Sequence, residues 1–422
     1  MQTVFDWLPE SLKWLVYSVL IRLLIKSPSP ENSHKLQPSD GHQCWLFCST
    51  IGEVNACKPL IDELSTRFNL VFFTDRSNYI ATFKQLYPSA HVISLEQLGS
   101  VQTVIDHYQP QQVFICEIPA LPNDAPCKLS YDFLRKVKKA GTKLHLINAW
   151  LYDYGPACRQ DKLERLLFRQ EYVKLFDTIS AQNEDVASRL IEAGGKNVVV
   201  TGNMKFDALT DSTVKVKDQI SMALLAQYTQ SSKPTFIAGC VSGFWEYELV
   251  IPAMRWALDR GFEGHFIIAP RHPEKPEHLA KIEQLLTQYK LTFGCKSQLE
   301  EGVDFPFQVL VLDTIGELKS YYSVVDCAYI GLNHNVLEPL AFNLPLVVTG
   351  NWNQQFPSYP VYYETKKLGL LHEVNCAADI GQFILDSTKK TPSSNDAANK
   401  LQKLAGATAK CKQNINRIQP LF

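Results

Sequence analysis

Residues 44–64, CWLFCSTIGEVNACKPLIDEL, predict a strand, a tight turn and a helix in direct succession. The apolar run 44–49 has the length of a buried strand, and the spacing of apolar residues over 54–64 is typical of a helix with one buried face. Gly52 lies in the turn between them, where it permits an unusual backbone angle or the close approach of a ligand. A strand followed directly by a helix is the repeating unit of a parallel sheet covered by helices.

The same unit recurs along most of the chain. Strands are expected at 44–49, 70–73, 91–94, 112–116, 143–148, 178–182 and 198–201, then at 235–239, 265–269, 308–313, 326–330 and 344–349. Helices between them are expected to include 54–64, 129–139, 184–193, 246–260 and 276–289. The alternation predicts an α/β protein with two doubly wound domains that face a cleft. Ligands of such domains bind beyond the carboxyl ends of the strands.

The expected domain boundary lies where the strand signal weakens. Residues 207–234 are more polar than their surroundings and poor in strand-like runs. We therefore expect Rossmann-like domains over 41–207 and 208–400, preceded by a helix and polar linker over 1–40 and followed by a C-terminal helix over 401–422.

Composition narrows the class of protein only slightly. The 422 residues have a net charge of -1 and are 45% hydrophobic, which excludes wholesale disorder and gives no global attraction to nucleic acid. The 11 cysteines include no C-x-x-C pair. This usage is typical of a reducing compartment and argues against a disulfide framework or a zinc cluster.

The N-terminal segment 12–25, LKWLVYSVLIRLLI, is the most hydrophobic helix-like stretch. Its 14 residues would make a helix of about 21 Å, shorter than the roughly 30 Å hydrocarbon core of a bilayer. The segment contains Lys13 and Arg22, and on a helical wheel Ser11, Ser18, Arg22 and Lys26 fall on one narrow stripe. The pattern predicts a helix that lies in a membrane interface. The alternative is an amphipathic helix packed on the protein's own body.

Three candidate catalytic residues follow expected strands of the first domain. Glu53 stands at a strand–helix junction, where a carboxylate suits a general base, or alternatively only favours the helix macrodipole. Glu117 follows the strand 112–116, where it either acts in the site or reaches solvent. Lys205, in GNMKFD, either stabilises developing negative charge or is a solvated turn residue.

Three segments of the second domain have the same position after a strand. Arg271, after Pro270, suits a phosphate or carboxylate, with an ordinary surface arginine as the alternative. The stretch Ile315-Gly316-Glu317 suits an anion at the start of a helix, and Asn335-Val336-Leu337-Glu338 places a carboxylate that can accept hydrogen bonds from sugar hydroxyls. For both stretches the alternative is ordinary helix capping.

Taken in order, six segments resemble the motifs of the bacterial 3-deoxy-D-manno-octulosonate (Kdo) transferases. The segments are STIGE (49–53), CEIP (116–119), GNMKFD (202–207), PRHPE (270–274), DTIGEL (313–318) and HNVLEP (334–339). The family patterns they resemble are SVGE, ETELWP, GN/SLKFD, PRHPER, DTMGEL and HNPLEP. The resemblance extends from about residue 42 to about residue 350. It implies the GT-B glycosyltransferase fold, with an N-terminal acceptor domain and a C-terminal nucleotide-sugar domain.

The resemblance implies a role for each matched residue. Glu53 corresponds to the family's catalytic base, and Glu117 and Lys205 correspond to groups that stabilise the transition state. The positions that correspond to CMP contacts are Pro270, Arg271, Ile315, Gly316, Glu317, Asn335, Val336, Leu337 and Glu338.

The resemblance also implies substrates and a location. The donor would be CMP-Kdo and the acceptor a lipid A precursor, at the cytoplasmic face of the bacterial inner membrane, in lipopolysaccharide biosynthesis. No cofactor is expected. The chain has no D-x-D, the spacing that commonly holds a divalent metal in other sugar transferases, so we predict a metal-independent reaction.

Several positions depart from the family's patterns. Trp150 replaces the Arg of N-A-R-L-S, and Pro119 replaces the second Glu of E-T-E-L. The loop 240–246, CVSGFWE, replaces S-T-H-x-G-E. The glycine-rich segment that precedes H-N-P-L-E-P in the family is shortened to residues 331–334, GLNH. Ile315 replaces Met and Lys275 replaces Arg. The aromatic residues Trp150, Phe244 and Trp245 would form a stacking surface for a sugar or lipid, or serve only as packing.

These departures leave three hypotheses. The first is Kdo transfer, the second is an enzyme of the same fold with another nucleotide sugar or acceptor, and the third is a non-catalytic binding protein. The retained Glu53 and Lys205 argue against the third.

Overall fold

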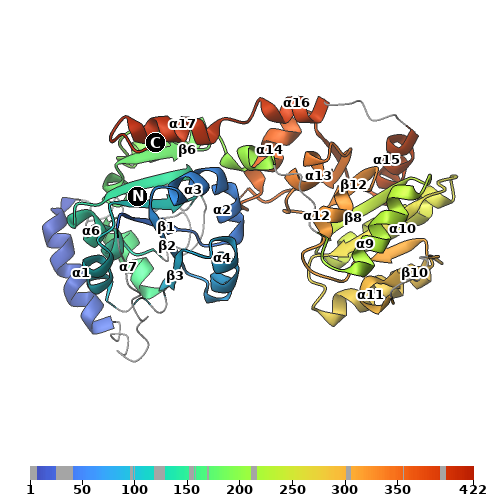
Figure 1. Ribbon diagram of the computed structural model, residues 1–422, viewed down its shortest axis with the longest axis horizontal. Helices are drawn as coiled ribbons and strands as arrows, with labels where there is room; N and C mark the ends of the chain where they lie inside the picture. The colour runs from blue at the N-terminus through green and yellow to red at the C-terminus, as the bar shows by residue number, and fades with distance from the viewer. Residues whose placement is uncertain are drawn as a thin grey trace. The chain divides into compact units, whose positions relative to one another are not determined.

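The computed structural model describes residues 7–24, 41–95, 98, 100–117, 129–151, 156, 158–168, 171–210, 216–300, 306–354, 356–389 and 396–422. The chain divides into two compact units (Figure 1). The first consists of Met1–Ala208 with Leu404–Phe422, and the second of Leu209–Lys403.

The first unit is built on a seven-stranded, entirely parallel sheet in the order β3-β2-β1-β4-β5-β6-β7. The strands are β1 (Gln43–Phe47), β2 (Asn69–Thr74), β3 (His91–Ser94), β4 (Gln112–Cys116), β5 (Lys143–Ala149), β6 (Thr178–Ala181) and β7 (Val198–Val200). The central strands β1 and β4 are buried along their whole length. Their continuous apolar sequences are what a parallel sheet covered on both faces requires.

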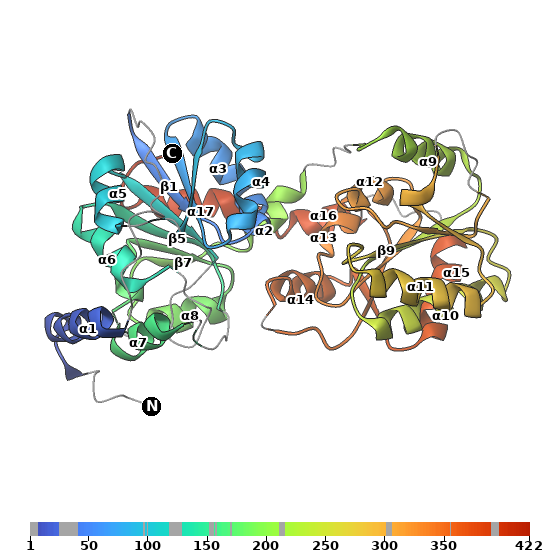
Figure 2. The same cartoon turned by 90° about the horizontal axis from the view of Figure 1, so that it is seen from below.

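Helices cover both faces of this sheet (Figure 2). They are α1 (Glu10–Leu24), α2 (Ile51–Ala56), α3 (Lys58–Ser65), α4 (Ile80–Leu86), α5 (Val101–Tyr108), α6 (Tyr131–Lys139), α7 (Arg159–Phe168), α8 (Glu184–Glu192) and α17 (Ala407–Asn416). Successive strand residues point to opposite faces, so Trp45 and Phe47 pack with α5, α6 and α7 while Cys44 and Leu46 pack with α2, α3 and α17.

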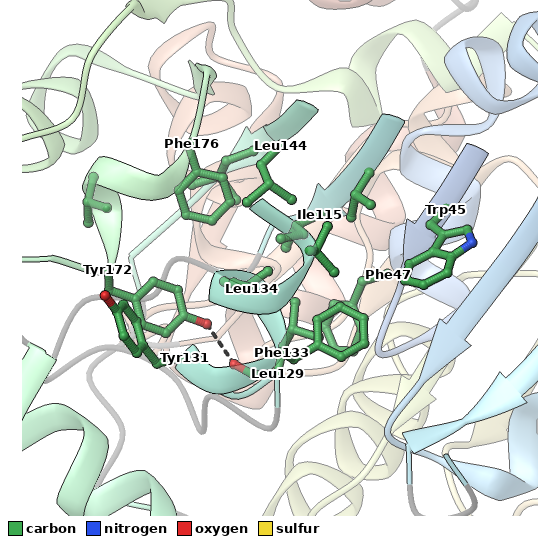
Figure 3. Packing of buried hydrophobic residues seen from close by; sticks show 14 of the residues in the cluster. Trp45, Phe47, Ile115, Leu129, Tyr131, Phe133, Leu134, Leu144, Tyr172 and Phe176 are labelled. Atoms are coloured by element: carbon green, nitrogen blue, oxygen red, sulfur yellow. Dashed lines mark hydrogen bonds between the residues drawn. The ribbon is translucent and has the colours of Figure 1, made fainter. Parts of the chain in front are cut away.

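The aromatic core of the first unit fixes Leu129, just before α6. Trp45 contacts Phe133 with ring centroids 6.0 Å apart, and Tyr172 donates a hydrogen bond of 2.6 Å to the carbonyl of Leu129 (Figure 3). Tyr131 stacks on Phe168 at 4.0 Å. This cluster joins β1, α6 and α7 into one rigid face of the unit.

Helix α1 packs on this face by its polar and aromatic side. Lys13 is 1% exposed and pairs with Glu171 at 2.7 Å, and Tyr17 donates a hydrogen bond of 2.5 Å to Glu164. The guanidinium of Arg135 lies 4.0 Å from the ring centre of Trp14. The predicted alternative of packing on the protein's own body is therefore correct for this side of the helix.

The other side of α1 is an exposed apolar stripe. We define the α1 stripe as Leu12, Leu15, Val19 and Leu23, which are between 42% and 77% exposed and share one side at helical spacing. Trp7, just before the helix, is 81% exposed. Lys26, part of the expected polar stripe, lies outside the described residues. Among the residues that the structure describes, no helix is long and apolar enough to cross a membrane.

The second unit repeats the architecture. Its parallel sheet has the order β10-β11-β9-β8-β12-β13-β14. The strands are β8 (Thr235–Val241), β9 (His265–Pro270), β10 (Phe293–Cys295), β11 (Val309–Val311), β12 (Cys327–Ile330), β13 (Leu346–Thr349) and β14 (Leu371–Val374). The helices are α9 (Gln219–Gln230), α10 (Phe244–Leu258), α11 (Pro276–Gln288), α12 (Leu318–Tyr322), α13 (Leu337–Ala341), α14 (Tyr359–Lys367), α15 (Ala377–Lys389) and α16 (Asp396–Gln402). The predicted α/β class with two Rossmann-like units is confirmed.

The C-terminal segment returns to the first unit. Residues 401–422, expected as one C-terminal helix, contain the end of α16 and the whole of α17, separated by a break at Gly406, whose φ is +100°. The carboxylate of Asp207 accepts hydrogen bonds from the backbone N–H groups of Gly406 and Thr408, at 2.5 and 2.6 Å. Cys411 and Ile415 of α17 are then buried in the core on the α2 and α3 side of the sheet.

Candidate functional site

The three predicted catalytic residues lie at one edge of the first unit's sheet. Glu53 follows β1, Glu117 follows β4, and Lys205 lies in the 3-10 helix Met204–Thr210 that follows β7. Because all seven strands run parallel, these carboxyl ends face the same side of the unit.

Glu53 is held in the first turn of α2. Its backbone N–H donates to the side chain of Thr50 at 3.3 Å, and its carboxylate accepts a hydrogen bond of 2.5 Å from the backbone N–H of Ser49. The residue is only 8% exposed. The position in the first helical turn, on which the macrodipole alternative rests, is thus present, but it does not exclude a role in catalysis.

Burial raises the pKa of the Glu53 carboxyl well above its ordinary value, and the negative charge of Glu117 raises it further. The Ser49 N–H and the charge of Lys205 oppose this rise. A solvent-exposed carboxylate in the first turn of a helix would instead have a lowered pKa, because the macrodipole favours the charged form. The raised pKa brings Glu53 toward the range in which a general base is most effective at neutral pH.

Glu117 and Lys205 form a buried ion pair. The Lys205 ammonium lies 2.9 Å from the Glu117 carboxylate, and the two side chains are 18% and 2% exposed. Glu117 also has a φ of +63°, a conformation that only a few per cent of non-glycine residues adopt. The alternative of a Glu117 that reaches solvent is therefore wrong, because its carboxylate is buried, while Lys205 is partly exposed and paired with that carboxylate.

Three buried thiols lie close enough to Glu53 to be affected by its charge. The Cys48 and Cys116 sulfurs are 3.3 Å apart, and Cys57 also interacts with Cys116. Burial raises the pKa of Cys48 to about 11, so this thiol is protonated at neutral pH and behaves as a small apolar side chain.

In the second unit, sequence reasoning missed Glu246 as the residue that joins two loops at the sheet edge. It is fully buried, and one carboxylate oxygen accepts hydrogen bonds of 3.0 to 3.1 Å from Ser242 and Gly243. The other accepts hydrogen bonds of 2.8 Å from the Tyr329 hydroxyl and the Leu332 N–H. Glu246 stands three residues after the N-cap Gly243, the position from which a glutamate side chain reaches back to the N-cap N–H, and this spacing was the signal that could have identified it.

Glu246→Gln is expected to lower the free energy of unfolding by about 3 kcal/mol, because an amide group would face buried donors. Chemical denaturation measures this loss. Glu248→Gln is the matched control on the same helix, since Glu248 is exposed and its pair with Lys281 is worth little. Equal stability of the two variants would contradict the linking role of Glu246.

The residues predicted to contact CMP lie at the same sheet edge of the second unit. Pro270 ends β9, and the backbone N–H of the exposed Arg271 donates to Val241 at 2.8 Å. Asn335 is exposed and its amide lies 3.3 Å from Glu338. Burial raises the pKa of Glu338, while Asn335 and the charges of Lys319 and Arg271 lower it. Val336 and Leu337 are buried, so their side chains are not accessible to a ligand.

The stretch Ile315-Gly316-Glu317 ends the loop between β11 and α12. Ile315 is exposed and Gly316 has a φ of +90°, which favours glycine. The Glu317 carboxylate is 1% exposed and is engaged by Lys296 at 2.8 Å and by the Ser221 hydroxyl at 2.7 Å. These buried interactions, which sequence reasoning missed, hold the stretch in place. Both oxygens of the Glu317 carboxylate already have partners inside the protein.

The three aromatic residues of the altered loops have different surroundings. Trp150 is half-buried and packs against the core of the first unit. Phe244 and Trp245 are nearly half exposed at the start of α10, where Phe244 lies 5.2 Å from the ring of His278. Packing therefore accounts for Trp150, and an exposed aromatic surface is present at Phe244 and Trp245.

Comparison with known proteins places this geometry in a family. The family model of "3-Deoxy-D-manno-octulosonic-acid transferase (kdotransferase)" matches residues 24–208, the segment with Glu53, Glu117 and Lys205. The 3-deoxy-D-manno-octulosonic acid transferase of Haemophilus influenzae is 26% identical over 350 residues, covering 79% of this chain and 76% of the relative. That of Chlamydia trachomatis serovar D is 26% identical over 325 residues, covering 73% and 70%.

The chain is a divergent member of the Kdo transferase family. It is therefore a glycosyltransferase. Solved structures add the fold: UDP-GlcNAc 2-epimerase from Neisseria meningitidis aligns with a TM-score of 0.57 at 14% identity, covering 89% of this chain and 99% of the epimerase. A putative UDP-N-acetylglucosamine 2-epimerase from Listeria monocytogenes aligns with a TM-score of 0.59 at 12% identity, covering 90% and 97%. These similarities show that this Kdo transferase family member has the two-Rossmann, GT-B-like fold.

Within the described residues, no group of three or more His, Cys, Asp or Glu side chains has the arrangement of a metal site. Metal independence of the reaction stays a prediction.

Proposed function

We propose that this Kdo transferase family member transfers Kdo from CMP-Kdo to a hydroxyl of a lipid A precursor, in lipopolysaccharide synthesis. The observation that carries the proposal is the buried Glu53, whose pKa is raised beside the Glu117–Lys205 ion pair within the segment that matches the family. A base of raised pKa next to a fixed cation suits the deprotonation of a sugar hydroxyl.

Each group of the first unit has a separate task in this reaction. A Glu53 oxygen accepts the proton of the attacking acceptor hydroxyl as the new glycosidic bond forms. Lys205 stabilises the negative charge that develops on the reacting groups, and Glu117 holds Lys205 in position at 2.9 Å. The carboxylate of Glu53 ends the step protonated and passes its proton to solvent after the product leaves.

The second unit is proposed to bind the donor. The bond between Kdo and the phosphate of CMP breaks, and the phosphate leaves with the electron pair. Arg271, whose side chain is exposed at the end of β9, is the proposed partner of that phosphate. Pro270 and the backbone of 315–317 and 335–337 line the proposed CMP site, with Glu338 as the acceptor of a sugar hydroxyl. No metal or cofactor takes part in this proposal.

The α1 stripe is proposed to hold the enzyme on the cytoplasmic face of the inner membrane, where a lipid-linked acceptor is presented. The apolar side chains face away from the body, and the exposed Arg22 lies near them, where it suits anionic headgroups. The buried Lys13 and Tyr17 fix the helix to the catalytic unit. The membrane and the proposed base would thereby be linked through one rigid unit.

Replacing Leu15, Val19 and Leu23 by Ser together is expected to weaken binding to phosphatidylglycerol vesicles at least about tenfold, because each apolar side chain contributes about 1.5–3 kcal/mol when it leaves water. Vesicle co-sedimentation measures the loss, and thermal unfolding in solution should not change. The matched control is Ile191→Ser on α8, which is also exposed and apolar. Vesicle binding that survives the triple substitution would show that the anchor lies elsewhere.

A second candidate function is a glycosyltransferase of the same fold with a different nucleotide sugar or acceptor. The observation that favours it is the exposed aromatic pair Phe244 and Trp245 in the loop that departs from the family pattern. An aromatic surface stacks on a sugar ring or a base and can change which donor is bound.

A donor panel separates the two candidates. Purified full-length protein on vesicles with lipid A precursor is supplied with CMP-Kdo, CMP-sialic acid or UDP-N-acetylglucosamine, with and without EDTA, and nucleotide release is measured. The proposal requires release from CMP-Kdo at a rate that EDTA does not change. Turnover with another donor but none with CMP-Kdo would establish the second candidate.

A further inference from the structure

Asn148 connects the two members of the Glu117–Lys205 pair. It lies near the end of β5 and is fully buried, 0% exposed. Its side-chain N–H donates a hydrogen bond of 2.9 Å to the Glu117 carboxylate. Its side-chain oxygen accepts a hydrogen bond of 2.9 Å from the backbone N–H of Met204, the residue before Lys205. One amide therefore contacts both the carboxylate and the backbone that carries its cation.

The backbone of β5 is distorted at this residue. Pairing between β5 and β6 shifts register between Leu146 and Ala149, and Asn148 has a φ of +51°. A bulge of this kind re-aims a side chain, and it is common beside active sites. The Gln182 side chain donates a hydrogen bond of 2.8 Å to the Asn148 carbonyl, and this bond holds the distorted segment in place. Left-handed backbone is tolerated by Asn and Asp and is easiest for Gly.

Resting on the proposed function, we propose that Asn148 is a positioning residue, whose amide orients the Glu117 carboxylate toward Lys205 and fixes the segment that carries Lys205. An amide is suited to this task because it presents one donor and one acceptor without charge. A leucine or alanine would leave the Glu117 oxygen and the Met204 N–H without this partner, inside a region that excludes water.

Two substitutions separate the amide from the backbone conformation. Asn148→Gly keeps the positive φ at low cost but removes both hydrogen bonds. Asn148→Asp keeps the shape and the acceptor, and it can donate to Glu117 only while it is protonated. Two carboxyl groups this close share a proton, so their apparent pKa values separate and one is raised.

The pKa of Glu53 reports on these substitutions, because it depends on the charges around its carboxyl group. The groups that act on its pKa are Glu117 after β4, Lys205 after β7, and Asp75 after β2. The thiols of Cys48, Cys57 and Cys116 respond in turn to the Glu53 charge. An ionised carboxylate at position 148 would add to the negative charge near Glu53 and raise its pKa further.

The matched control is Asn414→Asp. Asn414 is another buried amide of the same unit, 2% exposed, and its hydrogen bonds go to Ile179, Ser180 and Asn197. The substitution creates a buried carboxyl of the same kind, and the hydrogen bonds of Asn414 involve neither Glu117 nor Lys205.

The first test is the pH dependence of kcat/KM for donor turnover. For Asn148→Gly, kcat/KM is expected to fall about tenfold at every pH. Asn148→Asp is expected to approach the parent enzyme at acidic pH and to lose activity progressively as the pH rises, because its donor is lost on ionisation. Asn414→Asp should change activity by a factor that does not depend on pH. Full activity of Asn148→Gly, or a profile of Asn148→Asp parallel to that of the control, would overturn the proposal.

The second test needs no turnover and therefore stands if the proposed function fails. The Glu53 carboxyl signal, assigned through Glu53→Gln, is titrated by carbon-13 NMR in protein with labelled glutamate. The pKa of Glu53 is expected to move upward by about one unit in Asn148→Asp and to stay unchanged in Asn414→Asp. An unchanged Glu53 titration in both variants would overturn the placement of Asn148 in this cluster.

Discussion

Glu53→Gln is expected to lower kcat about 10²–10⁴-fold while nucleotide binding is retained, because the amide cannot accept the proton of the acceptor hydroxyl. The substitution keeps the size of the side chain and an oxygen that can accept the hydrogen bond from Ser49. Steady-state turnover measures the loss, and calorimetric titration with CMP measures binding to the same preparation.

Glu184→Gln is the matched control for this variant. Glu184 also stands in the first turn of a helix, α8, but it is exposed to solvent. Its substitution should leave turnover within a factor of two of the parent. If Glu53→Gln turns over as fast as Glu184→Gln, Glu53 is not the base.

The same variant has a consequence for stability. The folded-state pKa of Glu53 is raised above its unfolded value, so its favourable contribution is present below the unfolded pKa and is lost as the pH rises through the folded pKa. Glu53→Gln removes that loss and should therefore raise the Tm on the alkaline side relative to the acidic side. Glu184→Gln should show no such pH-dependent gain.

Lys205→Met is expected to lower kcat about 10²–10³-fold and to shift the acid limb of the pH profile upward. The first effect follows from the loss of a fixed cation at the reacting groups. The second follows because the charge of Lys205 lowers the Glu53 pKa, so its removal lets that pKa rise. Glu117→Gln is expected to move the acid limb in the opposite direction, since the charge of Glu117 raises the same pKa.

Lys205→Met should also lower the free energy of unfolding by about 3–5 kcal/mol, because the buried Glu117 carboxylate loses its cation. Lys138→Met is the control, since Lys138 pairs with the more exposed Asp177 in the same unit. Acid limbs that do not move in Lys205→Met and Glu117→Gln would contradict the electrostatic coupling of these groups to Glu53.

The fold was largely predictable because buried parallel strands have an unambiguous sequence pattern. All five residues of β1 and all five of β4 are buried, and both strands were expected from their apolar sequence. The strands β10 and β14 were missed. β10 has three residues and includes Gly294, while β14 exposes His372 and Glu373. Both lie at the edges of the sheet, where fewer apolar neighbours constrain the sequence.

The N-terminal helix shows how a single-helix wheel can fail. The wheel placed the polar side at Ser11, Ser18 and Arg22, yet the buried side contains the charged Lys13. A buried lysine is compatible with packing only because Glu171 lies 2.7 Å away. That partner is 158 residues distant in sequence, so no local pattern could reveal it.

Some residues of the site could be predicted from local sequence motifs, and others could not. Glu53, Glu117 and Lys205 were found because they stand in ordered motifs that resemble a family. Asn148 and Glu246 were missed because their importance comes from hydrogen bonds to residues far along the chain. The positive φ of Asn148 is likewise a property of the bulge in β5, which the sequence of the strand alone does not specify.

The central claim is Kdo transfer to a lipid-linked hydroxyl with Glu53 as the base. The most direct measurement is mass spectrometry of a lipid A precursor after incubation with CMP-Kdo and the full-length protein on vesicles, with released CMP quantified in the same reaction. The account predicts a lipid product heavier by Kdo units, one CMP released for each Kdo added, and no such product with Glu53→Gln. An unmodified acceptor with folded, vesicle-bound parent protein, or equal product from Glu53→Gln, would contradict it.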